Sequence, residues 1–410
     1  MTVDFEVRSL SPDELDAYIR AIAGAFGTRF RQHDVDAVRP LMEYERSLAA
    51  YDGKAIVGVN AVATFQMTVP GAIVRTGGVA TVATLPTHRR RGVMTALMGR
   101  QLDDIHERGE PLAALWASEA GIYGRFGFGA ATLACSFDVQ RNHAAFAAPV
   151  RPEGRVRLVD LDQAVQAFPA VHDRVLPVRP GMIERTEAWW RYRLAEDVGG
   201  EEEGGFVPFY ALYEAGGSAH GYVAYGVKHA HAADGTPANV LGVEELEAAT
   251  DDAYAALWRY CFDVDLSERI MAGNRPPDEP LLFMLAEPRR LGFRVSDGMW
   301  VRVVDVPAAL GARMYGAAGR VVLEVRDAVC PWNDGRFVLE GGPGVAACEP
   351  TSEEPDLVLQ AADLGAAYLG GVPLRTLAAA GRVVELTDGA LATAGAMFAW
   401  DPAPWCPYMF

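Results

Sequence analysis

The segment YGRFGFG, residues 123–129, begins with a tyrosine that could take part in acid–base chemistry. A phenol with a pKa of about 10 can give a proton to a leaving thiolate of similar basicity, and it stays protonated at neutral pH. The alternative role for the ring is packing beside Phe126 and Phe128. The choice between the two roles depends on whether the chain also binds a group that releases a thiolate.

Upstream of this tyrosine, three arginines and a glycine form the turn Arg89–Gly92. A strand predicted over residues 79–85 runs into the turn, and apolar residues at helical spacing predict a helix over 92–106. The unpaired amides and the dipole of a helix N-terminus favour an anion, glycine permits close approach of a phosphate, and arginines add charge-assisted hydrogen bonds. Three solvated arginines are the alternative. A nucleoside triphosphatase is disfavoured because the chain has no GxxxxGK[ST] motif.

The elements around this turn predict an α/β domain. Residues 13–26 have helical spacing after a cap at Ser11, and strands are predicted over 47–51, 55–68 and 112–116. A fainter copy of the pattern follows, because residues 240–262 predict a strand and then a helix. The stretch 287–306 aligns with 121–140 when Gly292 is placed over Gly127. This alignment puts Pro288 at the position of Tyr123, so we expect an internal repeat in which only the first copy retains its chemistry.

From about residue 310 the pattern changes to an α+β domain. Strands are predicted over 319–327 and 335–341, short helices bounded by glycine over 363–371 and 373–381, and a longer helix over 389–400.

The composition limits the classes of function. With 410 residues, half of them hydrophobic, the chain predicts two or three folded domains. The net charge of −17 argues against nucleic acid as a partner and permits a cationic substrate. Long apolar runs and a basic N-terminal region are both missing, so we expect no membrane span and no secretory signal. The five cysteines lack metal-ligand spacing, which favours reduced thiols, a cytoplasmic location and no bound metal.

Other reactive residues give weaker signals. His220 stands where a nucleophile elbow requires glycine, and His229 and His231 have no carboxylate placed to complete a metal site. Cys135 lies in a strand-like run and is predicted to be a buried structural thiol.

The Arg-x-x-Gly turn followed by Tyr-x-x-x-Gly-Phe resembles the GCN5-related N-acetyltransferases. Within this superfamily, PTHRRRGV, SEAGIYGRFGFG, the repeated core and the aromatic terminus resemble the enhanced intracellular survival (Eis) family over the whole chain. The resemblance implies a catalytic N-acetyltransferase domain at residues 1–150 and a degenerate one at 151–298. It also implies a domain similar to sterol carrier proteins at 299–410 and, commonly, a homohexamer.

The resemblance also implies roles for individual residues. The turn amides would hold the pyrophosphate of acetyl-CoA, the strand before the turn would pair with its pantetheine arm, and Tyr123 would be the general acid. No metal is implied. The residues that would bind the coenzyme are Val82, Ala83, Thr84, Arg89, Arg90, Arg91, Gly92, Val93, Met94, Thr95, Ser118 and Glu119.

The terminus WCPYMF, residues 405–410, is apolar, whereas chain ends usually fray as polar tails. Burial would desolvate the terminal carboxylate of Phe410, raise its pKa from roughly 3.5 and make it a better proton acceptor. The alternative is a hydrophobic plug. In the Eis family the terminal carboxylate is the general base. That family often has an acidic residue just before the terminal aromatic, and Met409 stands there in this chain, so substrate preference stays open.

The resulting prediction is direct acetyl transfer to primary amines of polycationic small molecules such as aminoglycosides, with a consequent role in antibiotic resistance. Candidates for the amine pocket are Phe26, His33 and Glu119. Two alternatives stay open: a non-catalytic protein that binds coenzyme A or lipid, and an N-acyltransferase that takes a longer acyl donor.

Overall fold

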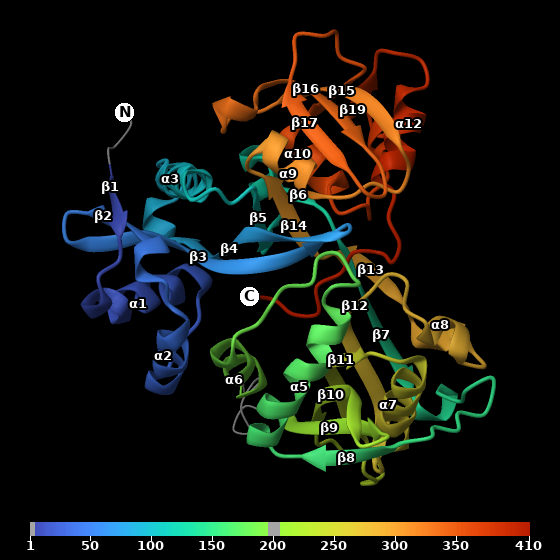
Figure 1. Ribbon diagram of the computed structural model, residues 1–410. Helices are drawn as coiled ribbons and strands as arrows, with labels where there is room; N and C mark the ends of the chain where they lie inside the picture. The colour runs from blue at the N-terminus through green and yellow to red at the C-terminus, as the bar shows by residue number, and fades with distance from the viewer. Residues whose placement is uncertain (1–4, 196–205) are drawn as a thin grey trace. The chain divides into compact units, whose positions relative to one another are not determined.

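The computed structural model describes residues 5–195 and 206–410, which form two seven-stranded sheets and one five-stranded sheet (Figure 1). The chain divides into two compact units. The first unit comprises Met1–Thr132, Gly298–Pro404 and Met409–Phe410, and the second comprises Leu133–Asp297 and Trp405–Tyr408. Among the described residues, no helix has both the length and the apolar character needed to cross a membrane.

The first sheet is antiparallel except for one parallel pair, β4 with β5. In spatial order its strands are β1 (Glu6–Ser9), β2 (Ser47–Asp52), β3 (Ala55–Val69), β4 (Ala72–Thr84), β5 (Leu112–Trp116), β14 (Met299–Val303) and β6 (Gly129–Ala130). The predicted strand over 79–85 is therefore the second half of a longer strand.

Helices cover both faces of this sheet (Figure 1). Alternate residues of a strand point to opposite faces, so in β2 the side chains of Leu48 and Ala50 pack with α3 (Val93–Glu107), whereas Ala49 and Tyr51 pack with α1 (Leu15–Phe26). The predicted cap at Ser11 is present: Ser11 and Glu14 form a capping box before a short 3₁₀ turn that leads into α1. The shorter helices α2 (Gln32–Val38) and α4 (Ala120–Tyr123) belong to the same region.

The second sheet repeats the order of the first. Its strands, in corresponding order, are β8 (Arg155–Val159), β9 (Val207–Ala215), β10 (Ser218–Lys228), β11 (Asn239–Ala248), β12 (Ser267–Arg275), β7 (Leu133–Gln140) and β13 (Arg294–Asp297). Again a single pair is parallel, β11 with β12, which corresponds to β4 with β5. The helices of this unit are α5 (Leu161–Val175), α6 (Glu187–Ala195), α7 (Asp251–Asp263) and α8 (Leu281–Met284).

The matching strand orders confirm the internal repeat. Gly127 and Gly292, which the alignment superimposed, both end a 3₁₀ turn with positive φ, at 82° and 59°. The copies also exchange strands: β7 follows the first copy in sequence but pairs in the second sheet, and β14 follows the second copy but pairs in the first. The expected boundaries at 150 and 298 therefore do not coincide with the sheets, because strand pairing over long sequence distances leaves no local pattern.

The third region has the predicted α+β character. Its sheet has the order β17 (Ala346–Pro350), β16 (Gly335–Gly341), β15 (Gly319–Arg326), β18 (Leu357–Gln360) and β19 (Val383–Glu385). The helices are α9 (Val306–Ala312), α10 (Ala361–Ala367), α11 (Leu374–Ala379) and α12 (Ala390–Phe398). The last three coincide with the three helices predicted for this region.

Candidate active site

The two parallel strands of the first sheet separate part-way along their length. Their pairing begins at Thr76 with Leu112 and ends at Val79 with Leu115, after which β4 continues to Thr84 paired with β3 alone. Just beyond this point β4 has a bulge, marked by a shift in its register with β3 and by a φ of 51° at Thr81. We call residues Ala80–Thr84 of β4 the first splay. One edge of this segment pairs with β3. The opposite edge has no partner strand, so its backbone N–H and C=O groups can pair with an extended ligand.

The bulge is held in place by a side chain from α1. The hydroxyl of Tyr18 lies 3.0 Å from the hydroxyl of Thr81, and the Tyr18 ring is buried. Bulges re-aim side chains and end strand pairing, and they are common beside active sites. The sequence analysis identified Val82, Ala83 and Thr84 in this strand, but neither Tyr18 nor Thr81.

The turn after the first splay leads directly into α3. Arg90 and Gly92 both have positive φ, 61° and 89°, and Gly92 is the N-cap residue of the helix. No side chain caps α3 and no acidic residue lies in its first turn. The first hydrogen bond of the helix runs from the amide of Ala96 to the carbonyl of Gly92, at 3.0 Å. The amides of Val93, Met94 and Thr95 are therefore oriented to bind an anion.

All three arginines of the turn are exposed. Arg89 donates a hydrogen bond to the carbonyl of Ala25 at 3.3 Å, while Arg91 lies 3.8 Å from Asp52 and over the ring of Phe5. These contacts keep two guanidinium groups beside the start of α3. Combined with an uncapped helix start, this arrangement favours an anion site over three merely solvated arginines.

Tyr123 is the last residue of α4, shortly after the end of β5. Its side chain is only 4% exposed, and its ring meets Phe128 edge to face with centroids 6.3 Å apart. Burial raises the pKa of the Tyr123 hydroxyl; a hydrogen bond with Ser118 lowers it and the nearby charge of Glu119 raises it. The ring is thus packed, and its hydroxyl stays protonated across the neutral range.

The C-terminal residue packs against Phe65 of β3 and Gly78 of β4. The ring of Phe410 meets Phe65 of β3 edge to face, with centroids 4.9 Å apart. A Cβ at Gly78 would come within 3.2 Å of the Phe410 ring and 2.3 Å of Phe65, so glycine makes room for both rings. Gly78 precedes Val79, the last residue of β4 that pairs with β5. The structure therefore brings together the predicted coenzyme strand and the predicted terminal base.

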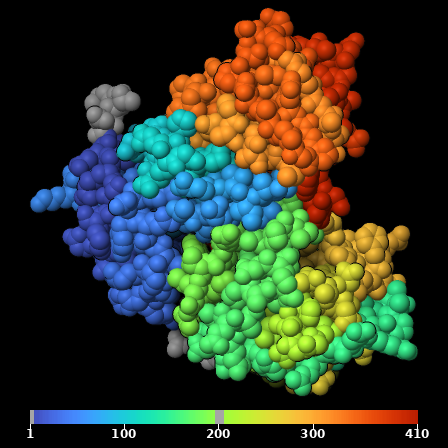
Figure 2. All heavy atoms as spheres, in the orientation of Figure 1, coloured from blue at the N-terminus to red at the C-terminus, as the bar shows by residue number. Residues whose placement is uncertain are grey.

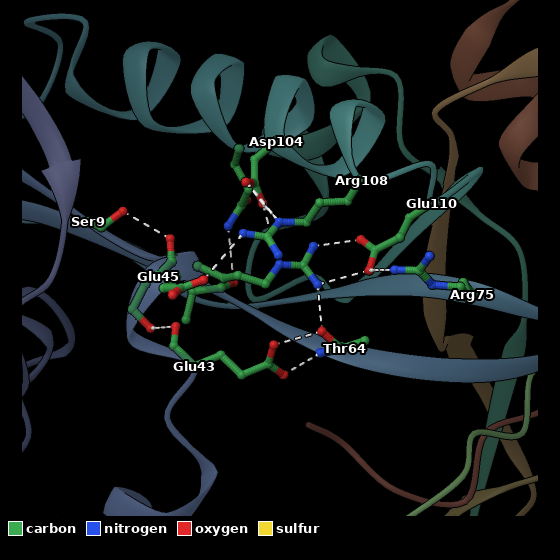
Figure 3. Close-up of polar contacts among 12 residues, drawn as sticks. Ser9, Glu43, Glu45, Thr64, Arg75, Asp104, Arg108 and Glu110 are labelled. Carbon is green, nitrogen blue, oxygen red and sulfur yellow. Dashed lines mark hydrogen bonds and ion pairs between the residues drawn. The ribbon is translucent and has the colours of Figure 1, made fainter.

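A buried ionic network fixes the far end of α3 (Figure 3). The guanidinium of Arg46 makes two hydrogen bonds to the carboxylate of Glu110, at 2.9 and 2.6 Å, and a third to Thr64 at 2.7 Å. Asp104 lies 3.4 Å from Arg46 and also pairs with Arg108. The sequence analysis did not find this network, whose members come from distant segments. The outer face of α3 is exposed on the molecular surface (Figure 2).

The predicted pocket residues are more scattered. Phe26 ends α1 and is about half exposed, His33 lies on α2 paired with Asp34 at 3.0 Å, and Glu119 is the exposed residue before α4. A cavity of about 420 Å³ between α1 and α2 has none of these three among its lining residues.

The remaining reactive residues form no second site. Cys135 is buried in β7, where burial raises its thiol pKa to about 11, which confirms the prediction of a structural thiol. His229 follows β10, and His231 lies in an isolated bridge with Pro237. No group of three potential metal ligands occurs within residues 5–195 and 206–410.

Comparison with protein families matches each region to a known domain. Residues 6–131 and 181–303 each match an acetyltransferase (GNAT) domain, and residues 306–407 match a sterol carrier protein domain. The chain is 41% identical to an uncharacterized N-acetyltransferase of Streptomyces coelicolor over 99% of both chains. It is 35% identical to the N-acetyltransferase Eis of Mycobacterium tuberculosis over 96% of both. The crystal structure of Eis1 from Mycobacterium abscessus superimposes with a TM-score of 0.85 at 33% identity, covering 99% of this chain and 100% of that one.

Proposed function

Because the chain belongs to the Eis family of GCN5-related N-acetyltransferases, we propose that it acetylates primary amines of polycationic small molecules such as aminoglycosides. The observation that carries this proposal is the first splay leading into an uncapped helix start. GNAT domains imply use of acetyl-CoA, and a pantetheine arm with a diphosphate at one end matches the shape and charge of these two features.

In this proposal the coenzyme binds through backbone and arginine groups. The amides of Val93, Met94 and Thr95, with the side chains around Gly92, would bind the diphosphate. Val82, Ala83 and Thr84 would pair with the amides of the pantetheine arm as an added strand. The acetyl thioester would then lie where β4 and β5 separate, and Ser118, Glu119 and Tyr123 follow the end of β5 on that side.

The reaction then needs proton transfers at the substrate amine, at the leaving sulfur and at the new amide nitrogen. The carboxylate of Phe410 accepts a proton from the substrate ammonium, and the neutral nitrogen attacks the thioester carbonyl carbon. A C–N bond forms, the C–S bond breaks, and its electron pair stays on sulfur. The Tyr123 hydroxyl gives its proton to this thiolate, so coenzyme A leaves as a neutral thiol. The amide nitrogen loses its remaining extra proton to solvent, and the Phe410 carboxylic acid loses a proton while the Tyr123 phenolate gains one, which restores both groups for the next cycle.

The substrate class is supported by charge and chemistry. Primary amines are cationic at neutral pH, and the net charge of −17 favours their approach. By family likeness we also propose a homohexamer in the cytoplasm; light scattering of the purified protein measures the assembly.

Free-thiol release tests the proposed activity. Purified protein is incubated with acetyl-CoA and kanamycin, spermidine or a neutral disaccharide, and each rate is compared with thioester hydrolysis alone. We expect release above hydrolysis with the two amines only. Propionyl-CoA and myristoyl-CoA in place of acetyl-CoA test for a longer acyl donor: faster turnover with myristoyl-CoA would replace the acetyl assignment. Hydrolysis-level rates with every amine would overturn the substrate class.

A further inference from the structure

The parallel strands of the second sheet also separate part-way along their length. The pairing of β11 with β12 ends at Val243 with Ala272, and β11 continues to Ala248 paired with β10 alone. A bulge at Glu244 comes directly after the last pair of β11 with β12. In the first sheet, the bulge at Thr81 likewise comes shortly after the last pair of β4 with β5. We call Glu244–Ala248 the second splay. It occupies the same topological position as the first.

The chain's own C-terminal segment lies against Asn274 of β12, the strand that parts from β11 at the second splay. The amide of Trp405 donates to the carbonyl of Pro180 at 2.8 Å, and its indole N–H donates to the carbonyl of Asn274 at 2.9 Å. The side-chain amide of Asn274 donates back to the carbonyl of Cys406 at 3.0 Å. Gly181 admits the tail closely, because a Cβ there would lie 3.1 Å from the carbonyl oxygen of Trp405.

Asn274 is positioned for this contact by the backbone of β12. It has a φ of 45° at a register shift between β12 and β7, and such left-handed positions favour asparagine and glycine. The irregularity turns both its carbonyl and its side chain toward the tail, so a single residue provides one acceptor and one donor.

Two buried arginines complete the contact. Arg275 lies over the ring of Trp405 and donates to the carbonyl of Leu246 in the second splay, at 2.9 Å. Arg185 lies over the ring of Tyr408, 4.0 Å from its centroid, and pairs with Glu245 of the splay at 2.9 Å. Cation–π contacts gain strength when desolvated, and Trp405 and Tyr408 are 4% and 1% exposed.

We infer that Asn274 of β12 and the two arginines held by the second splay form a binding site for residues Trp405–Tyr408, and that Asn274, Arg185 and Arg275 are positioning residues for the terminal carboxylate. The positioning role rests on the proposed function of Phe410. Only Met409 and Phe410 follow Tyr408, so fixing Tyr408 removes most of the conformational freedom that the carboxylate would otherwise lose during catalysis. The second copy thus binds a segment of its own chain, whereas the first copy is proposed to bind coenzyme.

Two conservative substitutions test this inference in the full-length protein. Asn274→Asp keeps a residue that tolerates positive φ but removes the donor to Cys406. Trp405→Phe keeps an aromatic ring but removes the donor to Asn274. Tyr260→Phe is the matched control, because it removes a 2.7 Å hydrogen bond to Tyr225 in the same unit without touching the tail. Thermal denaturation of each variant verifies that the protein remains folded.

The first measurement is hydrogen exchange by mass spectrometry, which needs no activity. We expect the amides of Trp405, Cys406 and Tyr408 to exchange about five- to tenfold faster in Asn274→Asp, and those of residue 405 and its neighbours likewise in Trp405→Phe, as expected for one lost hydrogen bond, with no change in the control. The second measurement is steady-state kinetics. We expect kcat to fall about tenfold in both tail variants while the KM for acetyl-CoA stays within twofold.

The possible outcomes separate the two parts of the inference. Unchanged exchange of residues 405–408 in both variants would overturn the binding of the tail by the second copy. Faster exchange with unchanged kcat would overturn the positioning role alone. If the unmodified protein released no thiol with any amine, the proposed function would fail, yet the exchange experiment would still decide whether the second copy holds the tail.

Discussion

The two copies have the same strand order, and each has a bulge beside its splay. The helices that follow, α3 in the first copy and α7 in the second, differ in the charge at their N-termini. In the first copy, α3 begins at Gly92 without a capping side chain and without acidic residues in its first turn. In the second, the hydroxyl of Thr250 caps α7 by accepting from the amide of Ala253 at 3.2 Å, and Asp251 and Asp252 lie in the first turn.

This difference bears on which ligand each copy is proposed to bind. The amides at the start of α7 already have a partner, and two carboxylates repel a diphosphate there. Asp252 also accepts hydrogen bonds from the amide of Glu153 and the hydroxyl of Tyr213, so it is fixed in place. The start of α3 therefore suits an anionic ligand, whereas the start of α7 does not.

The largest expected effect comes from making the first copy resemble the second at Tyr123, where the second has Pro288. Tyr123→Phe should lower kcat by about 10²- to 10³-fold, the usual contribution of a general acid, because the thiolate would leave without a proton. Acetyl-CoA affinity should change less than about twofold, since the ring still packs against Phe128. Steady-state kinetics measures kcat, and calorimetry measures the affinity for acetyl-CoA. A kcat equal to that of the unmodified enzyme would exclude the tyrosine from the mechanism.

The pH dependence of kcat follows from the burial of the same hydroxyl. Burial raises its pKa, and the acid role needs the protonated form, so activity through this group is lost only as the pH rises above the raised value. We therefore expect no decline of kcat from Tyr123 between pH 7 and its ordinary pKa of about 10. A descending limb that begins below pH 9 and disappears in Tyr123→Phe would contradict this expectation.

One glycine added after Phe410 should lower kcat by about 10²-fold although it deletes no atom, because it moves the carboxylate by one residue. Met409→Ala is the matched control: its side chain is 65% exposed, and the substitution leaves the chain length unchanged. The kcat values of both variants are compared under saturating acetyl-CoA. Full activity in the extended chain would remove the terminal carboxylate from the mechanism.

Thr95→Asp transfers the acidic first turn of α7 to α3. We expect the KM for acetyl-CoA to rise about tenfold, because a carboxylate would compete with the diphosphate for the helix start. The same change should stabilise the protein without coenzyme by about 0.5 kcal/mol, since it complements the helix dipole. Thr95→Asn is the control, because asparagine has nearly the shape of aspartate without its charge. Denaturant unfolding measures the stability of both variants. A KM raised equally by both variants would mean that charge is not the cause.

The smallest expected effect is confined to the second copy. Thr250→Ala removes the cap of α7 and should cost about 1 kcal/mol of folding free energy. It should leave the KM for acetyl-CoA unchanged, because this helix start is not proposed to bind coenzyme. If calorimetry of this variant showed tighter coenzyme binding or a second bound equivalent of coenzyme, then the cap, and not the tail, would be what prevents coenzyme from binding at the second splay.

Local signals in the sequence predicted much of the first site. The helix expected over 92–106 is α3, at Val93–Glu107, and the strand expected over 112–116 is β5. The strand ending at residue 85 was placed correctly at its C-terminal end, but β4 begins at Ala72. Gly77 and Gly78 interrupted the apolar pattern there; a side chain at Gly78 would clash with the ring of Phe65 and crowd the ring of Phe410, which is remote in sequence.

By itself the sequence determined the turn chemistry, the positions of caps and glycines, the repeat and the family, because each depends on residues near one another in the chain or on their order. Only the tertiary structure decided that β7 and β14 exchange sheets, that both parallel pairs separate just before a bulge, and that the terminal six residues contact β4 at one end and Asn274 at the other. These features depend on hydrogen bonds and packing between residues far apart in sequence, whose partners leave no periodic trace in either segment.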